Sequence, residues 1–79
     1  MMTRDKVEQA VHEVIGQILP GVTEIPGDKH LRELGADSVD RVEIILGVLD
    51  RLGVDEPMSS FSDLPNVGAL VDFLWERAA

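Results

Sequence analysis

The chain has no cysteine, few basic residues and no long apolar run. Without cysteine, neither a disulfide bridge nor a thiolate metal site can form, so helix packing must stabilise the fold. Lys and Arg number 7 against 15 Asp and Glu, and a net charge of −8 disfavours nucleic acid and acidic membranes as partners. No segment approaches the roughly 20 apolar residues of a membrane span, and no signal-peptide core follows the start. We expect a soluble, cytoplasmic protein.

The length and patterning predict a single all-α domain over residues 1–79. The chain has no alternating apolar pattern long enough for a strand, and it has no internal repeat. Apolar spacing and cap signals predict three main helices and one short third helix, a small four-helix bundle. The predicted helices run from Thr3 or Arg4 to Leu19, from Ser38 to Leu52, from Ser59 to Asp63 and from Val67 to about Arg77.

Residues 20–36 form a long predicted loop between the first two helices. Several prolines and glycines in this segment discourage regular structure. A structureless loop of this length is uncommon in so small a domain and is often functional. We expect Ile25, Leu31 and Leu34 to hold the loop against the core, and residues 28–34 to make one helical turn.

Two apolar stripes run along the second predicted helix. Since only one face of a bundle helix needs to be apolar, the other stripe is either extra core or an exposed patch for a partner. Periodicity alone leaves both assignments open. One stripe contains Val39, Val42, Leu46 and Leu49; the other contains Ile44, Ile45, Val48 and Leu52.

Ser38 stands at the start of this helix between two aspartates. Asp37 is placed to cap the helix, and Asp40 can reach back in a capping box. As a nucleophile Ser38 would need a base and an oxyanion hole; the only histidines are His12 and His30, and a Gly-x-Ser-x-Gly elbow is absent. A plain helix-start serine and an attachment point remain, the latter because a helix N-terminus favours a phosphate.

The segment Leu34-Gly35-Ala36-Asp37-Ser38-Val39 resembles the attachment signature of the acyl carrier protein family. Asn66-Val67-Gly68-Ala69-Leu70 at the last helix is also similar to this family. The resemblance implies a carrier, not an enzyme. It implies that a phosphopantetheinyl transferase, using coenzyme A and magnesium, attaches 4'-phosphopantetheine to Ser38. The thiol of this arm would then hold acyl groups as thioesters.

The resemblance also implies that partner enzymes dock on the second helix. It makes the stripe with Val39 exposed and the stripe with Ile44 core, and it predicts that Leu49→Glu leaves the fold intact. Arg41, Arg51 and Leu49 depart from the acidic helix of fatty-acid carriers and favour a less acidic, more hydrophobic docking face. The predicted docking residues are Asp37, Val39, Asp40, Arg41, Val42, Glu43, Leu46 and Leu49.

These departures favour a discrete carrier of polyketide assembly, which we expect to be monomeric. Residues 37–44 resemble free-standing carriers that deliver an acetyl unit to an HMG-CoA-synthase-like enzyme during β-branching. The other expected partners are an acyltransferase and a ketosynthase. A fatty-acid carrier, a peptidyl carrier and an unmodified interaction bundle are the alternatives.

Overall fold

A computed structural model of the protein describes residues 2–78 and confirms the all-α architecture. Its helices are α1 (Arg4–Ile18), α2 (Ser38–Leu52) and α3 (Val67–Ala78), joined by the short 3-10 turns η1 (Leu31–Leu34) and η2 (Met58–Phe61). The predicted short third helix is therefore a 3-10 turn that begins one residue earlier and ends two residues earlier than expected. Within the described residues, no helix is long and apolar enough to cross a bilayer.

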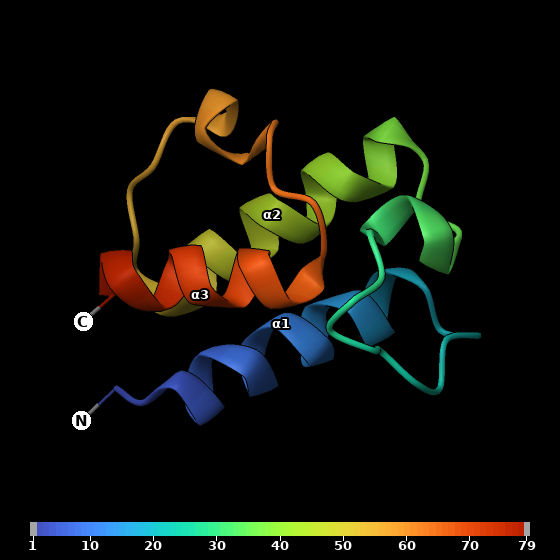
Figure 1. The fold of residues 1–79 in the computed structure, drawn as a ribbon, viewed down its shortest axis with the longest axis horizontal. Helices are drawn as coiled ribbons and strands as arrows, with labels where there is room; N and C mark the ends of the chain where they lie inside the picture. The colour runs from blue at the N-terminus through green and yellow to red at the C-terminus, as the bar shows by residue number, and fades with distance from the viewer. Residues whose placement is uncertain (1, 79) are drawn as a thin grey trace.

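The helix α1 packs against both α2 and α3. Figure 1 shows the long loop and the start of α2 at one end of the molecule, while the start of α1 and the end of α3 lie at the other. The molecule measures 31 × 24 × 20 Å. This arrangement gathers the loop, η1 and the start of α2 into one region.

The core is made of one apolar face from each helix. Burial of each such aliphatic side chain contributes about 1.5–3 kcal/mol relative to exposure. On α2, the assignment of Ile44 and Val48 to the core is confirmed, and Ile45 and Leu52 pack partly buried against it. The most deeply buried side chains are Val7, Val11, Ile15, Ile44, Val48, Val67, Val71 and Leu74.

The expectation that Leu49 is exposed is wrong: its side chain retains only 7% of its accessible surface. The cause is the turn that ends α2. Gly53 adopts a left-handed conformation (φ 66°), and the Val54 N–H donates to the Leu49 carbonyl at 3.1 Å. This Schellman turn commonly pairs the two apolar side chains at those positions. Leu49 and Val54 line the same surface depression, and Val54 packs against the core.

The long loop is fixed to the start of α3. The Val67 N–H donates to the Lys29 carbonyl and the Gly68 N–H to the Gly27 carbonyl, each at 2.8 Å. These bonds satisfy two of the amide groups that the first turn of a helix leaves without partners. Leu31 is buried, and Ile25 and Leu34 pack against the core, as the sequence predicts.

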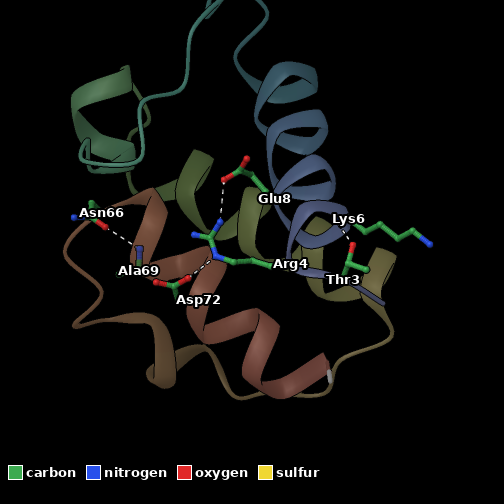
Figure 2. A network of polar contacts seen from close by, with 7 residues as sticks. All are labelled: Thr3, Arg4, Lys6, Glu8, Asn66, Ala69 and Asp72. Carbon is green, nitrogen blue, oxygen red and sulfur yellow. Dashed lines mark hydrogen bonds and ion pairs between the residues drawn. The ribbon is translucent and has the colours of Figure 1, made fainter. Parts of the chain in front are cut away.

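Polar contacts define the helix starts and join α1 to α3 (Figure 2). Side chains cap the helices α1 and α3: the Lys6 N–H donates to the Thr3 hydroxyl at 3.2 Å and the Ala69 N–H to the Asn66 side chain at 2.8 Å. The Arg4 guanidinium donates to Asp72 at 2.7 Å, which raises the pKa of Arg4.

Candidate functional site

The start of α2 is fixed by a reciprocal capping box. The Asp40 N–H donates to the Asp37 carboxylate at 2.8 Å, and the Asp37 N–H donates to the Asp40 carboxylate at 3.3 Å. Just before it, Gly35 ends η1 in a left-handed conformation (φ 98°), and the Ala36 N–H donates to the Leu31 carbonyl at 3.2 Å. The backbone is therefore held on both sides of the predicted attachment residue.

Ser38 is the first residue of α2 and is exposed to solvent. Among residues 2–78, no hydrogen bond joins its hydroxyl to a histidine. The Nδ1 atom of His30 instead accepts the Arg32 N–H at 3.0 Å, and His12 lies on α1. The part of the chain that the structure describes also holds no cluster of metal-ligating side chains. Ser38 is thus accessible to other molecules but lacks the partners of a catalytic serine.

Beyond Ser38, α2 presents a row of exposed apolar side chains that we call the exposed stripe. It consists of Val39, Val42 and Leu46, which retain 63%, 41% and 53% of their accessible surface. Asp37 and Glu43 are exposed, whereas Asp40 and Arg41 are half-buried. Every predicted docking residue is thus exposed or half-buried except Leu49, which belongs to the core.

A groove of about 430 Å³ lies beside Ser38, between α2 and the segment from η2 to α3. We call it the Ser38 groove. Its walls come from η1, α2, η2 and α3 and from the residues just before η1 and α3, so the groove could not be predicted from the pattern of any one segment. The apolar residues after position 57 were the one signal in the sequence for a further surface. The lining residues are His30, Leu31, Arg32, Ser38, Arg41, Val42, Ile45, Met58, Phe61, Ser62, Leu64, Asn66 and Leu70.

A small helical bundle that presents an accessible serine at a capped helix start, without catalytic partners, has the features of a carrier domain. The profile of the family described as the phosphopantetheine attachment site matches residues 5–74. The chain belongs to this family and is an acyl carrier protein. It is a carrier rather than a catalyst, and the family implies a covalently bound 4'-phosphopantetheine.

Similar proteins extend over almost the whole chain. The polyketide biosynthesis acyl-carrier-protein AcpK of Bacillus subtilis (strain 168) is 35% identical, with 96% of this chain and 95% of the relative covered. The acyl carrier protein of Rickettsia canadensis (strain McKiel) is 29% identical, with 98% and 92% covered. A similar solved structure is the crystal structure of the curacin biosynthetic pathway HMG synthase in complex with acetyl donor-ACP. The TM-score is 0.85 at 27% identity, over 95% of this chain and 99% of the matched one.

The residues around Ser38 fit the implied prosthetic group. The Ser38 hydroxyl is exposed, so an external enzyme can reach it. The N–H groups of the first turn favour the negative charge of a phosphodiester. The Ser38 groove provides both apolar and polar surface next to the attachment point.

Proposed function

We propose that this acyl carrier protein holds acyl groups as thioesters on a 4'-phosphopantetheine arm at Ser38 and presents them to enzymes of polyketide biosynthesis. The observation that carries the proposal is the exposed hydroxyl of Ser38 at a rigidly capped helix start, within the matched part of the chain. The similarity to a polyketide carrier supports the pathway class.

The chain itself supplies an oxygen atom and a docking surface. In a step that we assign to a phosphopantetheinyl transferase with magnesium, the Ser38 oxygen forms a bond to the phosphorus of the 4'-phosphopantetheine unit of coenzyme A. The diphosphate bond of coenzyme A breaks, and 3',5'-ADP and the hydroxyl proton leave. The arm supplies the thiol that holds acyl groups as thioesters. Asp37 and Asp40 hold the helix start in one conformation, so Ser38 is presented in a constant geometry.

The exposed stripe is the proposed docking face for partner enzymes, with Asp37, Asp40, Arg41 and Glu43 around it. An apolar centre with a charged rim is the anatomy of a transient interface, in which the rim charges guide encounter. The proposed partners are the transferase, an acyltransferase, a ketosynthase and an HMG-CoA-synthase-like enzyme. Leu49 is not part of this face because it is buried.

The similarity to an acetyl donor carrier bound to an HMG synthase favours one specialised role. We propose that the protein delivers acetyl groups to an enzyme of this kind, as a monomer in the cytoplasm. Loading the protein with an acetyl-pantetheine arm and measuring acetyl transfer to such an enzyme tests the role. Leu46→Ala should raise the KM for the carrier about tenfold, while Gln17→Ala on α1 should leave it unchanged. An equal KM for both variants would contradict the docking face.

Attachment at Ser38 is tested by incubating the protein with coenzyme A, magnesium and a broad-specificity transferase, followed by intact mass measurement. The wild-type protein should gain one arm, and Ser38→Ala should gain none. Ser59→Ala, in the exposed part of η2, is the matched control and should still be modified. An arm on Ser38→Ala, or none on the wild type, would overturn the proposal.

A further inference from the structure

The basic side chains of this acidic protein divide into two groups. Four of the seven Lys and Arg residues form ion pairs with carboxylates, and Lys6 also has a partner. The remaining two, Arg32 and Arg41, form no ion pair with any residue between 2 and 78. Both of these unpaired cations line the Ser38 groove. These four residues make five ion pairs: Arg4 with Glu8 and with Asp72, Lys29 with Glu33, Arg51 with Glu13, and Arg77 with Glu56.

The groove is also free of acidic side chains among the described residues, although the chain has 15 Asp and Glu. Asp37 and Asp40 are close to Ser38 in the sequence, but their carboxylates accept backbone N–H groups and do not line the groove. Because the Nδ1 atom of His30 accepts the Arg32 N–H, the Nε2 atom of this groove residue is left as a donor. The groove is therefore a local concentration of positive charge and donors in an acidic protein.

We propose that Arg41 and Arg32 bind the phosphodiester through which the arm is attached to Ser38. This inference rests on the proposed attachment at Ser38. Arg41 follows Ser38 by three residues on α2, and residues at this spacing are neighbours on a helix surface. A guanidinium group matches phosphate oxygens with paired donors, and Arg41 is half-buried without an ion-pair partner among the described residues, which favours an anion; Arg32 is exposed and its charge also acts on Glu33. The two arginines hold the root of the arm at the mouth of the groove.

The phosphodiester is a better match than a carboxylate at the far end of the cargo. A phosphate bonded to the Ser38 oxygen is always next to the groove, so its effective concentration there is high. A carboxylate on the acyl group is separated from Ser38 by the whole flexible arm. Both anions share the chemistry that arginine recognises, so the experiment has to separate them.

The test is phosphorus NMR of the protein carrying the arm, together with the side-chain Nε–H resonances of its arginines. Arm attachment should shift the Arg41 Nε–H resonance, and Arg41→Gln should shift the phosphorus resonance, with a smaller change for Arg32→Gln. Arg51→Gln removes one positive charge from the same helix but away from the groove, so it should leave the phosphorus resonance unchanged. In the wild type, raising the salt from about 0.05 M to about 1 M should move the phosphorus resonance toward its Arg41→Gln position.

Three further measurements make each outcome decisive. Intact mass reports the arm independently of any arginine: an unmodified wild type removes the proposed function and this inference together. An attached arm with a phosphorus resonance insensitive to both groove arginines overturns the inference alone. Comparing the Arg41 Nε–H resonance for arms loaded with acetyl and with malonyl, which has a free carboxylate, shows whether Arg41 binds the phosphodiester or the cargo. An Arg41 shift seen only with malonyl would make the cargo the ligand and would also overturn the inference. Circular dichroism of Arg41→Gln and Arg41→Lys verifies that the variants are folded.

Discussion

Gly47 divides α2 into two halves, and one of its two apolar stripes changes surroundings between them. The stripe of Val39, Val42, Leu46 and Leu49 is exposed before Gly47 and buried after it, whereas Ile44 and Val48 of the other stripe are buried in both halves. The two arginines of the helix follow the same division, because Arg41 has no ion-pair partner in the described part of the chain and Arg51 pairs with Glu13 of α1. The same stripe is thus an open surface before Gly47 and part of the core after it, so its residues in the two halves should respond differently to substitution.

The largest expected difference is between Leu49→Ala and Leu46→Ala. These leucines are three residues apart on α2, but Leu49 retains 7% of its accessible surface and Leu46 retains 53%. Truncation of the buried leucine removes core contacts and leaves a cavity, so we expect a loss of about 2–5 kcal/mol in the free energy of unfolding. Leu46→Ala should change it by about 0.5 kcal/mol or less.

Urea unfolding followed by circular dichroism measures both values. Leu49→Glu should be more damaging than Leu49→Ala because it buries a charge without a partner. This reverses the sequence-based expectation that Leu49→Glu leaves the fold intact. Equal losses for Leu46→Ala and Leu49→Ala would remove the distinction between the two halves.

Leu49 also shows why the sequence could not assign every face of α2. Val39, Val42, Leu46 and Leu49 form one continuous stripe, so periodicity gave all four the same environment. Their surroundings differ because the Schellman turn at Gly53 folds Val54 back toward Leu49. The dipeptide Gly53-Val54 was a usable signal, since an apolar residue directly after a capping glycine commonly contacts the last helical turn.

The start of α2 was predictable from the sequence because its contacts are local. The Asp37 cap, the reciprocal contact with Asp40 and the position of Ser38 all depend on residues within four positions of one another. The Ser38 groove depends instead on packing between distant elements, such as Arg32 of η1 and Leu70 of α3. The sequence also did not show that Arg41 lacks an ion-pair partner in the described part of the chain. Asp37 stands four residues earlier, at the spacing of a helical ion pair, but its carboxylate accepts the Asp40 N–H.

The next effect in size concerns the capping box at the start of α2. Asp37→Ala removes the acceptor of the Asp40 N–H and should lower the free energy of unfolding by about 1 kcal/mol. Asp37→Asn retains a capping oxygen and should preserve most of the stability. Thermal unfolding followed by circular dichroism measures both.

These two variants also separate the structural role of Asp37 from its proposed role in docking. If the negative charge guides partners, Asp37→Asn should slow modification by the transferase although the fold stays stable. A modification rate that matches the wild type would show that the charge is not used in docking.

Between the two halves of α2, Gly47 faces α1 closely. A Cβ atom at this position would lie 3.0 Å from a methyl carbon of the buried residue Val14. Alanine should gain about 1 kcal/mol in helix propensity, but the crowding costs about 1–3 kcal/mol. We therefore expect Gly47→Ala to lower the free energy of unfolding by about 0–2 kcal/mol.

A double-mutant cycle with Val14→Ala tests this explanation. When the methyl groups of Val14 are removed, Gly47→Ala should become stabilising, because only the helix propensity remains. If Gly47→Ala has the same effect with and without Val14, then contact with α1 is not the reason for a glycine at this position.

The smallest expected effect is in η1, which fixes the loop before Ser38. The Glu33 carboxylate accepts the His30 N–H at 3.3 Å and lies 3.6 Å from the Lys29 ammonium, and the His30 bond is the main cause of its lowered pKa. A carboxyl with a lowered pKa in the folded state stabilises the fold above its unfolded pKa, and this contribution is lost as the pH falls through the folded value.

Glu33→Gln should therefore lower the Tm slightly at pH 7, by less than Asp37→Ala does. The difference from the wild type should disappear as the pH falls from the ordinary value of 4.5 through the lower folded pKa. Thermal unfolding at a series of pH values measures this, and a difference that persists unchanged in strong acid would mean that Glu33 does not act through its charge.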